Sequence, residues 1–226
     1  MNSYQLLAAL KGLGHINNER DPWWWPDSGS LRVVVGALLT QQTRWEKVEQ
    51  SLANLRQAQC LTLSALADAD VAGLRRLIAP SGFYNTKAER LTKLAQNMRR
   101  DFGDFDTFRQ QVSRAWLLNQ AGIGPETADS ILCYACYRPV MVADAYSQRL
   151  LHALGVHAPD YASVQNWLLD GLQSHSRKVA DLYRPAIGTA RVYARFHGKI
   201  VEYCKHHSRG KRLDIAPLTD AIPSKL

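Results

Sequence analysis

Hydrophobic positions recur along most of the chain at the spacing of one face of an α-helix. Ser30 precedes the first clear stripe as an N-cap, and Gly155 follows the last one as a helix stop. The stripes are Leu31, Val34, Val35, Leu38 and Leu39; Trp45, Val48, Leu52 and Leu55; Leu91, Leu94, Ala95 and Met98; Phe108, Val112, Ala115 and Leu118; and Leu150, Leu151 and Leu154. The pattern predicts an all-α protein.

The remaining segments add little to this pattern. A long, partly basic helical region is predicted over residues 176–207, and the tail after Arg209 is expected to be irregular. Only PVMVAD (139–144) has an extended character, and it is too short to begin a sheet. With 226 residues the chain can bury a substantial core, as one compact unit or as two small lobes.

Charge and composition narrow the class of partner. Lys and Arg outnumber Asp and Glu 28 to 20, and this net charge of +8 favours a polyanion, nucleic acid before an anionic membrane surface. The longest strongly apolar run, residues 33–39, is far too short to cross a bilayer. The N-terminus lacks the pattern of a signal peptide, so a reducing cytosol is the expected compartment. Four scattered cysteines argue against a disulfide framework.

The stretch AGIGPETADSILC (121–133) joins two predicted helices through a glycine turn. Gly122 and Gly124 permit unusual backbone angles and close approach, and Pro125 suits the first position of a helix. Main-chain N–H groups at this helix start favour an anion, so a helix-hairpin-helix at about 109–137 can hold a DNA phosphate without reading sequence. The local sequence alone favours the simpler alternative, a tight helix–helix turn with ordinary caps.

Asp144 ends the extended segment and is predicted to cap the next helix. A carboxylate in that place is held ionised by the helix dipole and neighbouring N–H groups. It can therefore be a structural cap, or it can stabilise the oxocarbenium-like sugar that forms when a glycosidic bond breaks. The same geometry serves both roles.

LLTQQT, the hairpin and VMVADAYS, in this order and spacing, resemble the DNA glycosylase superfamily typified by endonuclease III. Together with WWWP, PSGFYN and YARFHGKIVEYC, they look like its monofunctional 3-methyladenine branch over nearly the whole chain. The resemblance implies a two-lobed fold, with a central six-helix lobe over 29–138 and a second helical lobe from 1–28 and 139–226. It also implies a DNA groove and base pocket between the lobes.

This resemblance implies that Asp144 is the catalytic residue. Glu126 stands where the endonuclease III type carries a lyase lysine, so water, not an amine, would attack the sugar and leave an abasic site in an uncut strand. The mismatch adenine glycosylases have an acidic residue where this chain has Ala37. The expected substrate is an alkylated purine, chiefly 3-methyladenine, in double-stranded DNA.

The resemblance also assigns residues to a base pocket and to DNA contacts. The pocket residues are Trp24, Trp25, Pro26, Trp45 and Lys199, with Trp24 and Trp45 sandwiching the flipped base. The DNA contacts are Gln42, which fills the hole left by that base, and Gly122, Ile123, Gly124, Glu126 and Thr127 of the hairpin. Core packing explains one or two of the tryptophans equally well, and solvent exposure would explain the glutamine and the lysine.

Lys199 raises an electrostatic question, because a free ammonium would repel a cationic base. We hypothesise that it is paired with a carboxylate, neutral or carbamylated; mass spectrometry and density at its amine would test this. No metal is expected, and with only Cys204 near the C-terminus the iron–sulfur cluster of many relatives should be absent. The resemblance does imply a monovalent cation at the hairpin carbonyls.

Two other functions stay open on the sequence. A bifunctional glycosylase–lyase acting on oxidised pyrimidines would form an adduct with DNA that borohydride traps. A non-catalytic protein that binds DNA structures would bind tightly without releasing any base. A monomer near the chromosome of a bacterial-type cytoplasm, with no membrane role, is the simplest expectation.

Overall fold

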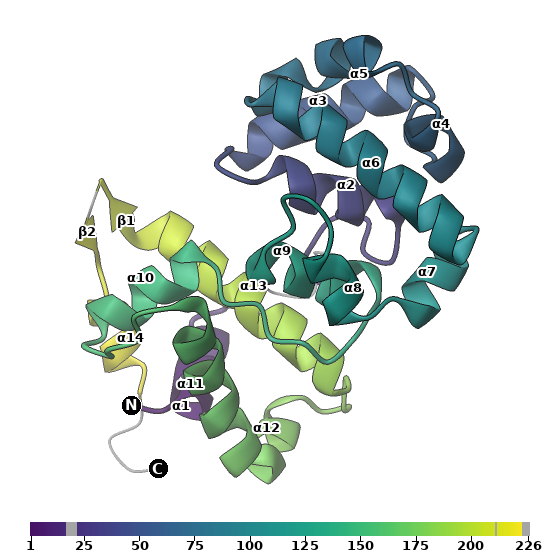
Figure 1. The fold of residues 1–226 in the computed structure, drawn as a ribbon. Coiled ribbons are helices and arrows are strands. Elements are labelled where there is room, and N and C mark those ends of the chain that lie inside the picture. The colour runs from purple at the N-terminus through teal and green to yellow at the C-terminus, as the bar shows by residue number, and fades with distance from the viewer. Residues whose placement is uncertain (17–21, 211, 223–226) are drawn as a thin grey trace. The chain divides into compact units, whose positions relative to one another are not determined.

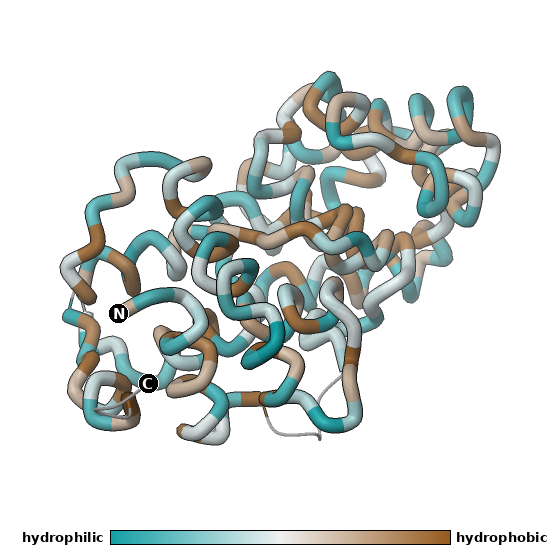
Figure 2. Tube along the Cα trace, turned by 90° about the horizontal axis from the view of Figure 1, so that it is seen from below, coloured by the Kyte–Doolittle hydropathy of each residue, from teal (hydrophilic) through white to brown (hydrophobic). Residues whose placement is uncertain are grey.

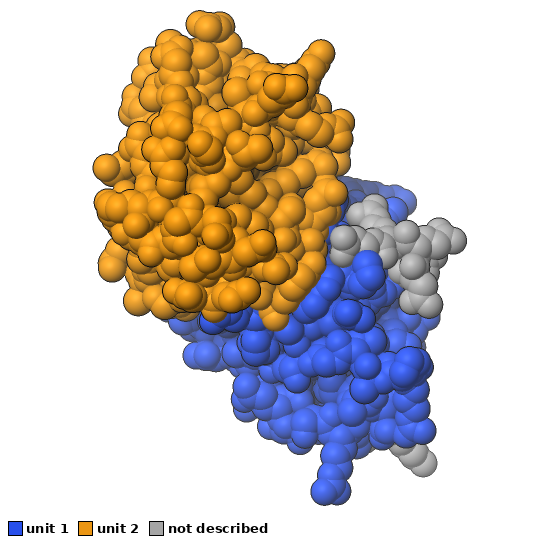
Figure 3. All heavy atoms as spheres, turned by 90° about the vertical axis from the view of Figure 1, so that its right-hand side faces the viewer, with its two compact units in different colours: residues 1–26, 138–226 blue, residues 27–137 orange. Residues whose placement is uncertain are grey.

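The computed structural model describes residues 1–16, 22–210 and 212–222, and its chain divides into two compact units (Figures 1 and 3). Unit 1 is formed by Met1–Pro26 and Arg138–Leu226, and unit 2 by Asp27–Tyr137. Both are helical, and hydrophobic and hydrophilic positions alternate along their helices (Figure 2). Among the described residues, no helix has the length and hydropathy that a bilayer-spanning segment needs.

Unit 1 is organised around one long helix near the C-terminus (Figure 1). Helix α13 (Thr189–His207) contacts α1 (Ser3–Gly12) and α10 (Ala145–Ala153), and α11 (Tyr161–Ser174) packs against both of these helices. Helix α12 (Ser176–Leu182) follows α11. Leu6, Leu10, Leu150, Phe196 and Ile200 are fully buried in the shared core.

Unit 2 is organised around α6 (Tyr84–Phe102) and α2 (Leu31–Leu39). Between them in sequence lie α3 (Trp45–Gln57), α4 (Leu63–Ala67), α5 (Val71–Ile78) and the 3₁₀ turn η1 (Ala79–Ser81). Helices α7 (Phe105–Gln111), α8 (Arg114–Leu118) and α9 (Pro125–Ser130) follow, and α9 runs into a π-helical turn, η2 (Ile131–Ala135). The resemblance implied six helices in this lobe; unit 2 contains eight α-helices, α2 to α9, of which α4, α7, α8 and α9 have only five to seven residues.

Side-chain caps explain where half of the fourteen described α-helices begin. Asn2, Thr62, Asp70, Asp104, Ser113, Asp144 and Asp160 each accept a hydrogen bond from a backbone N–H of the first turn. Ser30 does occupy the N-cap position of α2, but its hydroxyl donates to the Asp27 carbonyl at 2.6 Å instead of capping the helix.

Two predicted helices are each broken in the structure. The stripe from Phe108 to Leu118 spans α7 and α8, because Ser113 accepts from Trp116 N at 3.1 Å and starts a new helix. The region 176–207 is interrupted at 183–188. Pro185 has no N–H to donate there, and Gly188 takes a left-handed φ of 77° as the N-cap of α13.

The prediction of an irregular tail was wrong. Strands β1 (Ser208–Arg209) and β2 (Arg212–Leu213) pair antiparallel, and α14 (Ala216–Asp220) follows them. Residues 212–222 are held in place by apolar side chains: Leu218 is fully buried in the core of unit 1, and Leu213 and Ile215 pack against that core. The Tyr203 hydroxyl also donates to the Asp214 carbonyl at 2.7 Å.

Candidate functional site

Asp144 lies at the start of α10, after the buried residues Met141, Val142 and Ala143. Its Oδ1 accepts hydrogen bonds from the backbone N of Ser147 at 2.9 Å and from the Ser147 hydroxyl at 3.1 Å. The carboxylate is therefore the helix cap that the sequence predicts. Its side chain keeps 16 % of its exposure, so capping does not seal it from solvent.

The second carboxylate oxygen of Asp144 faces α13. Its Oδ2 lies 3.3 Å from Nε2 of His197, whose side chain is only 4 % exposed. Burial by itself raises the pKa of Asp144, but the His197 imidazole and the two hydrogen bonds from Ser147 outweigh it and hold that pKa below its ordinary value. The group is thus an anion at neutral pH, fixed through both oxygens.

Trp24 is held against α13 by three groups. A Cβ on Gly198 would lie 2.4 Å from Cγ of Trp24, so the indole can rest there only because residue 198 is glycine. Its Nε1 donates to Oε1 of Glu202 at 3.0 Å, and its ring meets His197 edge to face at 5.4 Å. The left-handed φ of 74° at Trp24 is a strained conformation for a bulky residue.

The other residues of the WWWP stretch differ in exposure. Trp25 is buried and meets Trp24 at 6.2 Å, whereas Pro26 is exposed. The guanidinium of Arg191 lies 5.5 Å from the Trp23 ring centre. Trp45 belongs to unit 2, where it begins α3 and is partly exposed, so the Trp24–Trp45 sandwich stays a prediction.

Lys199 is buried beside the N-terminal segment of unit 1. Its Nζ donates to the carbonyl oxygens of His15 and, at 3.3 Å, Ile16, while Arg195 donates to the carbonyls of Ile16 and Pro22. Burial, together with the positive charges of Arg195 and Lys11, lowers the pKa of Lys199 to about 8. Both described acceptors are backbone carbonyls, so a carbamylated or carboxylate-paired amine stays a prediction.

The sequence patterns did not identify His197, Gly198 and Glu202 as partners of this site. Arg195, Gly198, Lys199 and Glu202 follow one another at i, i+3, i+4 and i+7, so they share one face of α13. Polar residues and a glycine on a buried face of a core helix are uncommon. That pattern in YARFHGKIVEYC is the signal that could have identified Gly198 and Glu202, whereas His197 lies outside it.

In unit 2 the predicted hairpin is formed by α8, the turn 119–124 and α9. Gly122 takes a φ of 77°, Gly124 is the N-cap of α9 and Pro125 is its first residue. Arg114 of α8 forms a bidentate pair with the buried carboxylate of Asp129 in α9, at 2.7 and 3.2 Å. This pair joins the two helices of the hairpin.

The hairpin residues predicted to contact DNA lie in different surroundings. Gly122, Gly124 and Glu126 are exposed, whereas Ile123 and Thr127 are buried. Thr127 accepts a hydrogen bond at 3.0 Å from Gln41 Nε2, which also donates to the Gly122 carbonyl at 2.8 Å. The two buried residues therefore support the turn, and the exposed ones offer its surface.

Two exposed side chains on neighbouring turns stand out. Gln42 is exposed with a left-handed φ of 52°. Phe83, which no sequence pattern marked, has a φ of 46° and is 67 % exposed, the most of any large hydrophobic side chain among the described residues. Arg90 of α6 is a further missed residue: a Cβ on Gly122 would lie 2.5 Å from its side chain. Strain and exposed apolar surface of this kind concentrate at binding sites.

The hairpin carbonyl oxygens that were predicted to bind a monovalent cation already accept hydrogen bonds. The Gln120 carbonyl accepts from Ile123 N at 3.1 Å, and the Gly122 carbonyl accepts from Gln41. A cation there would have to share these oxygens with the N–H groups that already donate to them. Within the described residues no group of three His, Cys, Asp or Glu side chains could hold a metal, and all four cysteines are free thiols.

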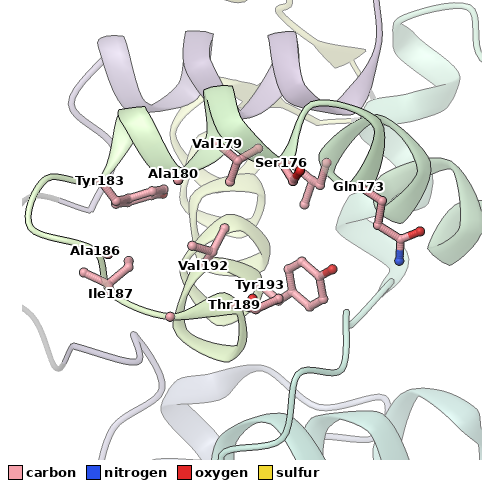
Figure 4. Close-up of a pocket in the computed structure, with 12 residues that line it drawn as sticks. Gln173, Ser176, Val179, Ala180, Tyr183, Ala186, Ile187, Thr189, Val192 and Tyr193 are labelled. Atoms are coloured by element: carbon pink, nitrogen blue, oxygen red, sulfur yellow. The ribbon is translucent and has the colours of Figure 1, made fainter.

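Unit 1 also contains a cavity of about 410 Å³ between α12 and the start of α13 (Figure 4). Its walls include Val179, Tyr183, Ile187 and Val192. The Tyr183 hydroxyl is buried and has no hydrogen-bond partner among the described residues. None of the predicted site residues lines this cavity.

Comparison with known proteins places these features in a family. Residues 35–173 match the model of the HhH-GPD superfamily of base excision DNA repair proteins. A Methanocaldococcus jannaschii protein named as a DNA repair glycosylase is 35 % identical over 98 % of this chain and 94 % of its own length. Endonuclease III of Thermotoga maritima is 30 % identical over 57 % of this chain and 58 % of its own.

Solved structures agree with this placement. The 3-methyladenine DNA glycosylase (MagIII) of H. pylori, crystallised with 1,N6-ethenoadenine, is 42 % identical with a TM-score of 0.89, over 93 % of this chain and all of that one. An endonuclease III–DNA complex shares the fold, with a TM-score of 0.74 at 16 % identity over 98 % of this chain and 95 % of that one. The chain therefore has the all-α helix-hairpin-helix glycosylase fold and belongs to the HhH-GPD superfamily of base excision DNA repair proteins.

Proposed function

We propose that this DNA glycosylase hydrolyses the N-glycosidic bond of alkylated purines, chiefly 3-methyladenine, in double-stranded DNA. The observation that carries the proposal is the carboxylate of Asp144, which is kept ionised by Ser147 and His197 yet retains solvent access. An anion with this environment stabilises positive charge that develops on a deoxyribose.

The chemistry needs one carboxylate and one water molecule. As the bond from C1′ to the base breaks, its electron pair leaves with the base, and an N3- or N7-alkylated purine, being cationic, leaves as a neutral molecule. The water oxygen then bonds to C1′, and its proton passes to Asp144 or to solvent. Such a leaving group needs no strong general acid.

The hairpin offers no amine for the alternative chemistry. Glu126, exposed in the first turn of α9, stands where the lyase branch has its lysine. A carboxylate cannot form the Schiff base that leads to strand cleavage. The product of this enzyme is therefore an abasic site in an intact strand.

Substrate selection follows from the aromatic and charged groups. The resemblance assigns Trp24, Trp25, Pro26 and Trp45 to the base pocket. Trp24 and Trp45 are partly exposed and would offer ring faces to the flipped base, and an aromatic face attracts a cationic purine by about 0.5–2 kcal/mol. Glu202, which orients Trp24, adds a carboxylate on the same helix as Lys199. The name and bound ligand of the H. pylori relative support a modified adenine as the substrate.

DNA contacts are assigned to unit 2. The main-chain N–H groups around the exposed residues Gly122 and Gly124 would bind a phosphate, with Arg90 beside Gly122. Gln42 and Phe83 would occupy the space that the flipped nucleotide leaves. A monomer suffices for all of these contacts.

The test is to identify both products. We expect the wild-type enzyme to free 3-methyladenine from methylated duplex DNA, to leave the strand uncut until alkali is added, and to form no adduct that borohydride traps. Release of oxidised pyrimidines with a trapped adduct would favour the bifunctional alternative. Tight binding with no base released from any lesion would favour a non-catalytic DNA-binding role.

A further inference from the structure

Lys87 is a buried lysine in unit 2 whose three N–H donors are all used. It lies in the first turns of α6 with 3 % exposure, and its Nζ donates to Leu39 O at 2.7 Å, Thr43 Oγ1 at 2.8 Å and Ser81 O at 2.8 Å. An ammonium has three donors and no acceptor, so its hydrogen bonding is complete. These partners come from two separate turns of the chain.

The acceptors are neutral, which makes the burial of this charge costly. Burial lowers the pKa of Lys87 to about 8. The carbonyl of Leu39 belongs to the last turn of α2, where the helix dipole favours a cation, but no carboxylate is among the three partners. An apolar side chain would fill this space at a lower desolvation cost. What the ammonium adds is a defined geometry.

That geometry fixes the two turns that carry the exposed, left-handed residues. Leu39 and Thr43 flank the turn that presents Gln42, and Ser81 lies two residues before Phe83. The Thr43 hydroxyl, which accepts from Lys87, also donates to the Ser81 carbonyl. Strained backbone conformations such as these persist only where the surroundings over-determine them.

A third connection leads from the first turn to the hairpin. Gln41, directly before Gln42, donates its amide to the Gly122 carbonyl and to the Thr127 hydroxyl. Three separate surface segments of unit 2 are thus joined by side-chain hydrogen bonds: the turn 40–43, the turn 81–83 and the hairpin.

We propose that Lys87 is a positioning residue for base flipping: it fixes the turn of Gln42 and the turn of Phe83 to each other, while Gln41 fixes the Gln42 turn to the hairpin. This inference rests on the proposed function, because it assigns the three segments to one DNA duplex. Without the ammonium the turns separate, and the duplex is bound without the base being held out.

The test compares Lys87→Met with Met98→Ala, which removes a buried side chain from the same helix outside this network. At a temperature where both variants are folded, we expect the backbone amide hydrogens of residues 40–43 to exchange with solvent faster in Lys87→Met than in the wild type. Misplaced groups commonly cost about 100-fold in rate, so base release at saturating DNA should fall by about 10- to 100-fold. Affinity for undamaged duplex should change less than about twofold, and Lys87→Arg should recover part of the rate.

Met98→Ala should keep the wild-type rate and the wild-type exchange at 40–43. A Lys87→Met enzyme with wild-type exchange and rate would overturn the inference, as would an equal loss of rate in Met98→Ala. If Lys87→Met does not fold, Thr43→Val and Thr43→Ser replace it: only the valine removes the hydroxyl, so only the valine variant should lose rate, and equal rates would overturn the inference.

The experiment separates this inference from the proposed function. If wild-type protein frees no alkylated purine, the proposed function fails, whereas the positioning role is still measured by binding to duplex that contains an abasic-site analogue. Lys87→Met should bind the duplex with the abasic-site analogue at least about tenfold more weakly than the wild type does. The two proteins should bind undamaged duplex with equal affinity. Equal affinity for the analogue would overturn the positioning role.

Discussion

Asp144 shows how one residue can be both a structural cap and a chemical group. The hydrogen bonds that begin α10 also hold its carboxylate ionised, and His197 approaches the other oxygen. The sequence allowed either interpretation, and the structure combines them in one geometry. The sequence could not reveal His197, because its contact with Asp144 spans more than fifty residues and depends on how α10 packs against α13.

Lys199 gives a prediction at this scale. Its pKa is about 8 in the folded protein, against 10.5 for an ordinary lysine, so between these values the unfolded chain binds more protons. The free energy of unfolding should therefore gain an increment as pH rises from about 8 to 10.5, of up to about 3 kcal/mol. Denaturant titrations of wild type and Lys199→Met should show this increment as a difference between the two curves. Parallel curves over this range would contradict the burial of an ionisable amine.

At the scale of elements, local signals predicted helix starts better than helix lengths. The glycines and proline of the hairpin, and the cap at Asp144, lie where the local sequence predicts them. The breaks at 112–113 and 183–188 were missed because an apolar stripe continues across each of them. The order of the tail was missed because it depends on the core that Leu218 joins.

Alanine substitutions at the two hairpin glycines should destabilise the protein by different amounts. Gly122→Ala should destabilise the protein by about 1–2 kcal/mol, because φ is 77° and the new Cβ would lie 2.5 Å from Arg90. Gly124→Ala should cost less than about 1 kcal/mol, because its φ is −91° and nothing lies within 4 Å of the added Cβ. Thermal unfolding of both variants measures the difference. Equal losses would mean that the turn does not have this conformation.

At the scale of the whole molecule, the sequence features divide between the two units. Asp144, Trp24 and Lys199 belong to unit 1, whereas Gln42, Trp45 and the hairpin belong to unit 2. Only the resemblance to the glycosylases assigned all of these residues to one activity. Periodicity and composition do not relate residues so far apart in the chain. The internal supports of each unit, α13 in the first and Lys87 in the second, became visible only through tertiary contacts.

The most direct test of the central claim compares two aspartates that cap helices in the same way. Asp144 accepts from Ser147 N at 2.9 Å, and Asp160 accepts from Ser163 N at 2.8 Å. Asparagine at either position keeps a capping oxygen and removes the charge. Single-turnover release of 3-methyladenine from methylated duplex DNA should fall by at least about 100-fold in Asp144→Asn and stay at the wild-type rate in Asp160→Asn. An Asp144→Asn enzyme that releases the base as fast as Asp160→Asn would contradict the account.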